Sequence, residues 1–424
     1  MMERRQSSQR SAAAAARVAM VVSNPGSDDS RVRKMAEAAQ RAGHEVTVFA
    51  TADERGPMSE TLGGVTYRRL RWRSWEEVAS GAFLRWPRRL APAPVELASK
   101  AAFVLLRHRL FARRFAPAIA AAAPQLIHAH DLICLPAACV AAAACGASVL
   151  YDAHELEADR FPAPPLPLRW HLARLERRWA RRADGVVTVG PSIARLLSQR
   201  LDRDDVDVVY NSPETAPCDD SLRRQLGLAP DRRLLLYVGK LTVGRGLFDV
   251  LPALVRLPEL EFALLGPADP RVREAFLARA RALGVDARCH VCKPVAPEHV
   301  TAFVRDADLG VIGVEPATLS YRYCMPNKLF ELAFAGVPIV ASRLDDVGAF
   351  IGEFDIGELV DFKDTDALAA TISRMLAGLD RYRPAASARL RMEAEYGWSA
   401  QADRLARRYD ALLRAVPVAG RARH

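Results

Sequence analysis

Residues 126–153 read LIHAHDLICLPAACVAAAACGASVLYDA, two short apolar runs on either side of a segment rich in alanine and leucine. The two runs, Leu126–His130 and Val149–Ala153, have the length and apolar character of buried strands. The segment between them has the composition of a helix. Because two strands connected through a helix lie parallel in one sheet, this stretch predicts an α/β fold.

The same alternation of apolar runs and helical segments continues toward both ends of the chain. Short apolar strands separated by helices are typical of parallel sheets that are buried on both faces. With right-handed crossovers, the pattern predicts two Rossmann-like, doubly wound domains that face each other across a cleft. The further strands that we expect are Arg17–Ser23, Glu45–Ala50, Val65–Leu70, Val186–Val189, Val206–Tyr210, Leu234–Gly239, Phe262–Gly266, Cys289–Cys292, Leu309–Val314, Pro338–Ser342 and Glu358–Asp361.

A break in the pattern follows Asn211, where SPETAPCDD carries two prolines and three acidic residues. We therefore expect a disordered tail at 1–16, an N-terminal domain at 17–211, a linker with a short helix at 212–232, and a C-terminal domain at 233–397. The last segment, 398–415, has apolar residues at helical spacing and predicts a terminal helix.

The composition excludes several classes of protein. Half of the 424 residues are hydrophobic and 26% are charged, which is too apolar for a mostly disordered chain. No run approaches the ~20 apolar residues that span a bilayer, so the sequence predicts no integral membrane protein. Seven cysteines without a framework spacing favour a reducing compartment. We therefore expect a cytoplasmic protein.

The basic charge is concentrated in one segment. Residues 68–114 hold twelve basic and three acidic residues, against a formal net charge of +10 for the chain. Three tryptophans, Trp72, Trp75 and Trp86, alternate there with arginines, a pattern that suits an anionic membrane surface. The segment predicts peripheral attachment to the inner face of the cytoplasmic membrane, and a helix with a solvated arginine face is the alternative. No recognition motif supports nucleic acid as the partner.

Ionisable side chains gather at the ends of two expected strands. The sequences HAHDL and YDAHE place His130, Asp131, Asp152, His154 and Glu155 near one sheet edge, where ligands of such folds bind. His128 and His130 form an H-x-H pair of the kind that metal hydrolases use, and Asp131, Asp152 and Glu155 could supply further ligands. One alternative function is therefore a metal-dependent hydrolase that uses His128, His130, Asp131 and His154.

A turn follows the first expected strand, where Pro25-Gly26-Ser27 opens onto a helix expected from Ser30 to Ala42. Such a turn presents backbone N–H groups to a ligand, although a purely structural turn is equally consistent with it. The stretch is not the fingerprint G-x-G-x-x-G, so a nicotinamide or flavin cofactor has little support.

The stretch YVGKLTVGRG indicates an anion site in the second half. Lys240 follows the strand directly, and Arg245 comes five residues later, just before a helix. Two cations beside a helix N-terminus suit a diphosphate, and incidental cations on a solvated loop are the alternative.

The stretch Ser320–Ser342, SYRYCMPNKLFELAFAGVPIVAS, predicts a short helix at about 326–335. Asn327 and Lys328 would lie in its first turn, beside free backbone amides. Glu331 follows Asn327 by four residues and so shares its face. A carboxylate at that position can accept two hydrogen bonds from the hydroxyls of a ribose.

Taken together, these segments resemble retaining glycosyltransferases of the GT-B fold, family 4, in the subgroup that bears PNKLFE. The matching segments occur in the family's order over about residues 17–415: DSRVRKMAEAAQRAGHEVTVFA, HAHDL, YDAHE, VVYNSPE, YVGKLTVGRG, PNKLFELAFAGVPIVAS and YGWSAQADRLARRYDALL. The resemblance implies the two-domain GT-B fold, with the C-terminal helix crossing back to the N-terminal domain.

The resemblance also assigns roles. Lys240 and Arg245 occupy the positions of a basic pair on the donor pyrophosphate, and His154 falls where the family often carries a histidine near the donor sugar. These three are the implied catalytic residues. Glu331 matches the second glutamate of the family's Glu, seven residues, Glu motif and would hold the donor ribose.

Three more donor-binding positions follow from the same resemblance. Asn327 and Lys328 would border the diphosphate, and Gly26 would let the first loop approach the donor. The sequence departs from the family at the first glutamate of the motif, which is Tyr323 here. Since that position contacts the sugar in the family, the identity of the donor sugar stays open.

The implied reaction transfers a sugar from a nucleotide-diphosphate donor, with retention, to a glycan or lipid-linked acceptor in bacterial-type surface polysaccharide or glycolipid synthesis. The family carries no metal-binding acidic motif, so we expect no metal and no cofactor other than the nucleotide-sugar substrate. A GT-B sugar-nucleotide epimerase is the alternative within the fold, and the metal-dependent hydrolase is the alternative outside it.

Overall fold

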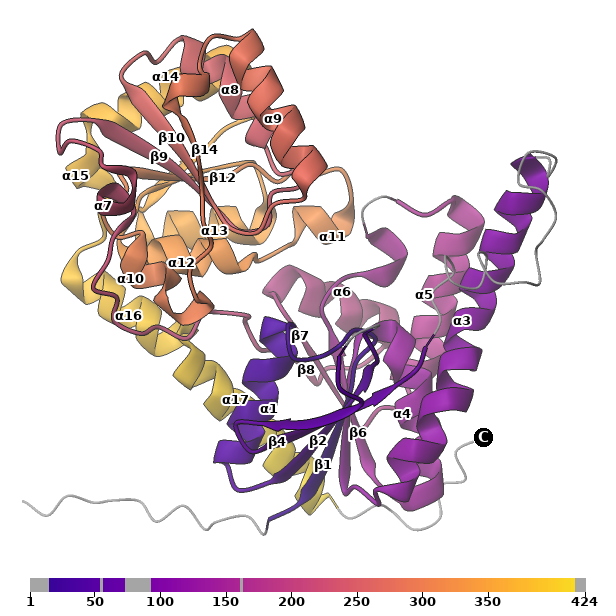
Figure 1. Cartoon of the computed structure of the whole chain (residues 1–424). Coiled ribbons are helices and arrows are strands. Elements are labelled where there is room, and N and C mark those ends of the chain that lie inside the picture. The colour runs from indigo at the N-terminus through magenta and orange to yellow at the C-terminus, as the bar shows by residue number, and fades with distance from the viewer. Residues whose placement is uncertain (1–14, 54–55, 73–92, 161–162, 416–424) are drawn as a thin grey trace, which may run out of the picture. The chain divides into compact units, whose positions relative to one another are not determined.

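The computed structural model describes residues 15–53, 56–72, 93–160 and 163–415 (Figure 1). For 93–105 it describes the helical backbone only. Most of the expected N-terminal tail, and the tryptophans at 75 and 86 in the basic segment, therefore lie outside the described residues. Within the described part of the chain, no helix combines the length and the apolar character needed to cross a membrane.

Contacts divide the chain into two compact units. The first contains Met1–Asp152, Glu176–Val186 and Arg404–His424, and the second contains Ala153–Leu175 and Val187–Asp403.

The first sheet has eight strands in the order β3-β4-β2-β1-β5-β6-β7-β8. The strands are β1 (Arg17–Val21), β2 (Glu45–Thr51), β3 (Ser59–Leu62), β4 (Val65–Leu70), β5 (Leu126–His130), β6 (Ser148–Ala153), β7 (Gly185–Thr188) and β8 (Val206–Val208). The central pairs are parallel, with β1 between β2 and β5.

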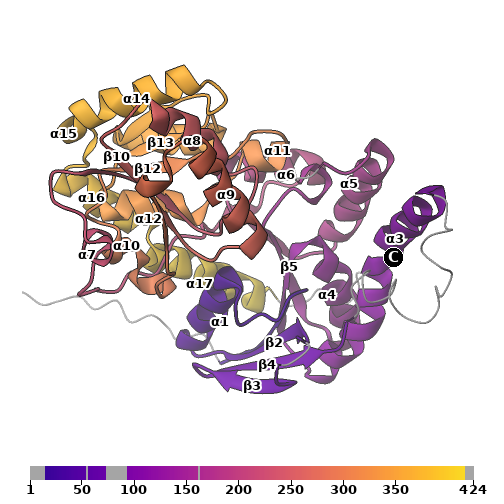
Figure 2. The ribbon, with the colours of Figure 1, turned by 45° about the horizontal axis from the view of Figure 1, so that its top comes forward.

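The edge strand β3 is a difference from the sequence-based expectation. It pairs antiparallel with β4, and Figure 2 shows it beyond β4 at the rim of the sheet. Its sequence, SETL, is polar and mostly exposed, so it lacks the apolar run that indicates a buried strand.

Helices follow the strands of the first sheet. They are α1 (Ser30–Arg41), α3 (Ala93–Ala121), α4 (Asp131–Cys145), α5 (Leu166–Ala180) and α6 (Pro191–Leu201), with a short 3₁₀ turn η2 (Glu157–Asp159). The Asp29 carboxylate accepts hydrogen bonds from the backbone N–H groups of Arg31 and Val32 and caps α1. Helix α4 is buried along most of its length, because its alanines allow close packing.

The second sheet has six parallel strands in the order β11-β10-β9-β12-β13-β14. They are β9 (Arg233–Val238), β10 (Leu260–Leu265), β11 (Cys289–Cys292), β12 (Leu309–Ile312), β13 (Ile339–Ala341) and β14 (Gly357–Leu359). Along β9, Leu236 packs into one hydrophobic core and Leu235 and Tyr237 pack into the other. The sheet is therefore buried on both faces, as the continuous apolar runs predict.

The helices of the second half complete these cores. They are α7 (Leu222–Leu226), α8 (Leu247–Val255), α9 (Pro270–Ala282), α10 (Val300–Phe303), α11 (Leu319–Arg322), α12 (Asn327–Ala335), α13 (Asp345–Phe354), α14 (Thr365–Ala377), α15 (Leu379–Tyr382), α16 (Ala386–Tyr396) and α17 (Trp398–Arg414), with 3₁₀ turns η3 (Asp286–Arg288) and η4 (Pro297–His299). All thirteen expected strands are present, and α12 confirms the expected helix at 326–335.

The last helix, α17, returns to the first unit. The Tyr409 hydroxyl lies 2.7 Å from Nδ1 of His128, at the centre of the first sheet. The Ser148 hydroxyl at the start of β6 donates to the carbonyl of Leu412, at 3.2 Å. These contacts confirm the expectation that the C-terminal helix crosses back to the N-terminal sheet.

Candidate active site

The candidate anion site lies in the second unit, around the loop that follows β9. Gly239, Gly244 and Gly246 all have positive φ angles, of 111°, 80° and 76°. A Cβ at Gly246 would lie 2.6 Å from the Cα of Gly313, so glycine is required there by close backbone packing. The loop therefore turns tightly and delivers Arg245 to the start of α8, as the sequence predicts.

Lys328, the second residue of α12, points at the end of β9. Its side chain is buried, and Nζ lies 3.6 Å from the centroid of the Tyr237 ring. A Cβ built on Gly239 would lie 3.7 Å from the same nitrogen. The first turn of α12 and the glycine loop are thus neighbours, and Lys328 lies between them.

The environment of Lys328 disfavours its charge. Burial, with repulsion from the Arg245 guanidinium, lowers the pKa of Lys328 from 10.5 to about 7, and the Glu331 carboxylate acts in the opposite direction. In the described part of the chain, no carboxylate oxygen lies within ion-pairing distance of this ammonium. The observed partner of Nζ is the face of an aromatic ring.

Arg245 and Lys240 are also without a carboxylate partner among the residues that the structure describes. The Arg245 guanidinium stacks on the ring of Tyr321, 4.9 Å from its centroid. Lys240 is exposed, and its carbonyl accepts a hydrogen bond from the Tyr237 hydroxyl at 2.9 Å. Burial raises the pKa of Tyr237 to about 12, so this hydroxyl remains a donor at neutral pH. Lys240, Arg245 and Lys328 are together called the cation cluster below.

Two other predicted donor residues lie on α12 or just before it. Asn327 and Glu331 are half-buried and one helical turn apart, so they share a face as expected. Tyr323 directly follows α11, and the Arg322 guanidinium lies 6.0 Å from its ring centroid. The aromatic ring of Tyr237 was not singled out from the sequence, although an aromatic residue at the end of a strand before Gly-Lys is a usable signal.

The loop that carries His154 also belongs to the second unit. His154 is half-buried, and two residues later the backbone N–H of Leu156 donates to the hydroxyl of Ser320, at 3.3 Å. Glu155 and Lys328 both influence the pKa of the buried Cys324 thiol, which burial raises to about 11. The loop is therefore fixed beside the segment that leads from α11 into α12.

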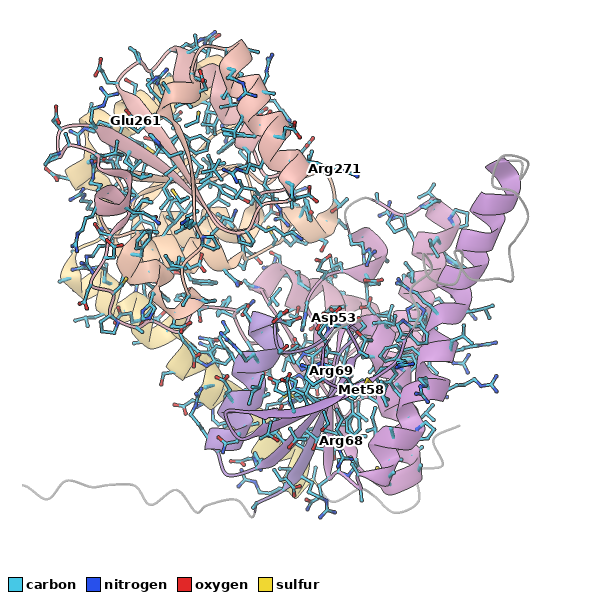
Figure 3. All side chains as sticks on the ribbon, in the orientation of Figure 1. Asp53, Met58, Arg68, Arg69, Glu261 and Arg271 are labelled. Carbon is cyan, nitrogen blue, oxygen red and sulfur yellow. The ribbon has the colours of Figure 1, made fainter. Side chains whose placement is uncertain are left out.

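Gly26 lies in the first unit, in a loop that is held in place by several hydrogen bonds. It has φ of 82°, and a Cβ there would lie 3.4 Å from Ala50 and from the ring of Tyr67. Arg69, labelled in Figure 3, donates to the Pro25 carbonyl at 3.1 Å and to the Ser27 hydroxyl at 3.2 Å. The glycine is required by the turn itself, so its conformation alone does not distinguish a structural turn from a contact loop.

The histidines of the first sheet form a buried cluster with Asp152. Candidate ligand atoms of His128, His130 and Asp152 all lie within 4.8 Å of one another. Arg31, however, donates to both carboxylate oxygens of Asp152, at 2.8 and 2.7 Å, and so neutralises its charge. A metal ion would have to compete with this guanidinium, which does not favour a metal site.

The structure brings together part of the ligand set expected for a metal-dependent hydrolase. Among the described residues the compact group contains His128, His130 and, of the carboxylates considered, Asp152; Asp131 and His154 are not in it. Asp131 begins α4 with φ of 64°, and His154 belongs to the second unit. The pairing of Asp152 with Arg31 spans 121 residues, so no local sequence pattern indicates it.

Comparisons with known proteins show which family and fold the chain resembles. Residues 30–216 match the model of the family described as Glycosyltransferase Family 4, and residues 232–378 match Glycosyl transferases group 1. The lipopolysaccharide 1,2-N-acetylglucosaminetransferase of Salmonella typhimurium is 26% identical over 197 residues, which cover 44% of this chain and 50% of that protein. The chain spans about half the length of the curated relatives that head the comparison.

Solved structures share the fold over nearly the whole chain. Sucrose-phosphate synthase from Thermosynechococcus elongatus has a TM-score of 0.72 at 20% identity, covering 94% of this chain and all of that one. Anabaena HepE, solved in complex with UDP-glucose, has a TM-score of 0.65 at 15% identity and covers 93% of this chain and all of that one. These similarities establish two Rossmann-like domains of the GT-B type.

Proposed function

Because the chain belongs to glycosyltransferase family 4, we propose that it transfers a sugar from a nucleoside-diphosphate donor to a glycan or lipid-linked acceptor, with retention at the anomeric carbon. The observation that carries this proposal is the cation cluster. Lys240 and Arg245 lie on the glycine loop after β9, and Lys328 lies in the first turn of α12 beside that loop; none of the three has a carboxylate within ion-pairing distance among the described residues. Such a site fits an anion with about two negative charges.

In the proposed reaction the sugar–phosphate bond breaks as the acceptor oxygen attacks the anomeric carbon from the same face. Lys240, Arg245 and the free amides of α12 stabilise the negative charge that develops on the departing diphosphate. The departing phosphate oxygen accepts the proton of the acceptor hydroxyl, so no protein nucleophile is needed. We propose no metal ion and no cofactor in this step.

The remaining site residues bind and orient the donor in this proposal. Glu331 accepts hydrogen bonds from the ribose hydroxyls, and Asn327 borders the diphosphate. His154 and Tyr323 contact the sugar, and the tyrosine there replaces a carboxylate with a neutral hydroxyl on a ring. Gly26 allows the first unit's loop to approach the substrates. We further propose that the second unit binds the donor and the first binds the acceptor.

The proposal of a lipid-linked acceptor rests on the part of the basic segment, residues 68–114, that belongs to α3. On α3, Leu106 and Leu110 are 48% and 44% exposed, and the arginines at 109, 113 and 114 are exposed around them. Apolar side chains among cations suit an anionic membrane surface. We propose that the protein works in the cytoplasm, at the inner face of the membrane, and contributes to surface polysaccharide or glycolipid synthesis.

Steady-state kinetics with a panel of nucleotide sugars and product analysis test the reaction. Lys240→Ala and Arg245→Ala should each lower kcat about 10²–10³-fold at saturating donor, as the loss of transition-state stabilisation does elsewhere. Lys363→Ala is the matched control, because Lys363 is already paired with Asp249 at 3.1 Å. Normal turnover in both site variants, or an epimerised donor as the product, would contradict the proposal.

The membrane proposal is tested separately by flotation with anionic vesicles at moderate salt. The wild-type protein should float with the vesicles, and a variant with Arg109, Arg113 and Arg114 changed to glutamine should float less. If the wild-type protein stays at the bottom of the gradient, the membrane proposal is contradicted and the exposed face of α3 is a solvated surface.

A further inference from the structure

Lys328 combines features that are unusual for a lysine whose role is only to stabilise the fold. It is 7% exposed, it lies in the first turn of the nine-residue helix α12, and its Nζ lies 3.6 Å from the centroid of the Tyr237 ring, beside Gly239. No carboxylate in the described chain pairs with it. Burying a cation without an ion-paired carboxylate costs several kcal/mol, and a bound anion would offset that cost.

The groups around Lys328 can be named from each element that packs against it. Tyr237 comes from β9, Arg245 from the loop before α8, Cys324 from the segment before α12, and Glu331 from α12 itself. Burial raises the pKa of Tyr237 to about 12 and of Cys324 to about 11, so both are neutral near pH 7. Of these groups only Glu331 is negatively charged, and it raises the pKa of Lys328. The positive charge of Arg245 lowers that pKa.

We infer that Lys328, buried against the Tyr237 ring beside the glycine loop, binds the donor's diphosphate and takes up a proton as the diphosphate binds. The inference rests on the proposed function and adds a linkage to it. A bound diphosphate supplies the negative charge that the protein omits, which stabilises the ammonium over the neutral amine. Donor binding then consumes a proton, whereas binding by Arg245 does not, because a guanidinium is always charged.

This linkage has a measurable signature. Where one proton is taken up on binding, the association constant falls about tenfold for each unit of rising pH. The dependence applies above about pH 7, where free Lys328 has lost much of its proton, up to the higher pKa of the complex. A permanently charged site would show no such slope.

Calorimetric titration with UDP, GDP and ADP tests the inference without any variant. At about pH 8, the nucleotide phosphates are fully ionised, so the protein is the source of any proton exchange. Titrations in HEPES and in Tris should give binding heats that differ by the buffers' heats of ionisation, in proportion to nearly one proton taken up.

Variants then assign the proton to Lys328. Lys328→Arg should retain binding and lose the proton uptake, and Lys328→Met should bind at least tenfold more weakly at about pH 7 and also lose it. Lys363→Met, an exposed lysine paired with Asp249, should behave as wild type.

Two outcomes overturn the inference in distinguishable ways. A nucleotide that binds with the same heat in both buffers, and equally well to the Lys328→Met variant, refutes the linkage and leaves the proposed function standing. The same holds if Lys328→Arg still takes up the proton. If none of the three nucleotides binds at any pH, the proposed function itself fails and the linkage fails with it.

Discussion

Arg31 and Lys328 occupy the same helix position in the two halves of the molecule, yet only Arg31 is paired with a carboxylate among the described residues. Each is the second residue of its helix, α1 or α12, and each is buried, with a residue exposure of 2% and 7%. Arg31 donates to both oxygens of Asp152, whereas Lys328 lies against a tyrosine ring without a carboxylate.

The difference separates a structural cation from one kept for a ligand. A guanidinium that forms two hydrogen bonds with a buried carboxylate is satisfied within the fold and has no free charge to offer. An unpaired lysine beside a second cation destabilises the folded protein until an anion binds. The proposed donor site, which contains Lys328, is therefore less stable than it could be, as is common for the active sites of enzymes.

The largest expected effect breaks the satisfied pair. Arg31→Met should lower the free energy of unfolding by about 3–5 kcal/mol, because it leaves the Asp152 carboxylate buried without its counter-ion. Urea denaturation measures the change. The double variant Arg31→Met with Asp152→Leu should recover part of the loss, since neither charge then remains. A single variant as stable as wild type would mean that Asp152 does not depend on Arg31.

The second effect has the opposite sign and depends on pH. The pKa of Lys328 is about 7 in the folded protein and ordinary, 10.5, in the unfolded chain. Between these values the unfolded chain holds a proton that the folded protein lacks, so wild-type stability should rise with pH across this window and be level below it.

Lys328→Met removes this pH dependence. The variant should be more stable than wild type by up to about 3 kcal/mol near pH 7, and the gain should shrink toward pH 10. Urea denaturation at several pH values measures the difference. A variant that is less stable than wild type at pH 7 would show that Lys328 is already satisfied in the free protein.

The third change gives Lys328 the partner that Arg31 has. The Cys324 thiol is buried and close enough for each group to influence the other's pKa. Cys324→Asp should pair with Lys328 and weaken nucleotide binding by about 10–100-fold, since the phosphate must then compete with a built-in carboxylate. Cys324→Asn is the uncharged control of similar shape. Equal affinities for the two variants would contradict a competition of charges.

The smallest expected effect concerns the surroundings of the Arg31 pair. Tyr409→Phe removes the hydroxyl that lies 2.7 Å from the buried Nδ1 of His128. It should lower the free energy of unfolding by about 1–2 kcal/mol, the usual range for a lost buried hydrogen bond. Because burial raises the pKa of Tyr409 well above 10, the loss should be the same from neutral pH to about pH 9. If the lost free energy of unfolding varies over that pH range, the loss does not come from the hydrogen bond between Tyr409 and His128.

The sequence predicted the sheets well because their strands are buried on both faces. Runs such as Leu126–His130 and Cys289–Cys292 match the observed strands β5 and β11 residue for residue. The edge strand β3 was missed because a polar edge strand has no apolar signature. Its partner, β4, was found because it alternates buried and exposed residues.

The candidate site was predictable in its residue types and not in its pairings. Local sequence placed Lys240 and Arg245 in a glycine loop and Lys328 in a first helical turn, as observed. Whether a buried cation has a carboxylate partner depends on contacts between distant segments. Arg31 meets Asp152 across 121 residues, and Lys328 meets Tyr237 from another element, so neither could be read from spacing.

The return of α17 to the first sheet has a consequence for synthesis. Tyr409 and Leu412 close contacts with His128 and Ser148, in strands that leave the ribosome more than two hundred residues earlier. The half of the protein that is translated first is thus the half that is finished last. During translation all strands of the second sheet are made before α17, so a nascent chain stopped before that helix would lack the contacts of Tyr409 with His128 and of Leu412 with Ser148.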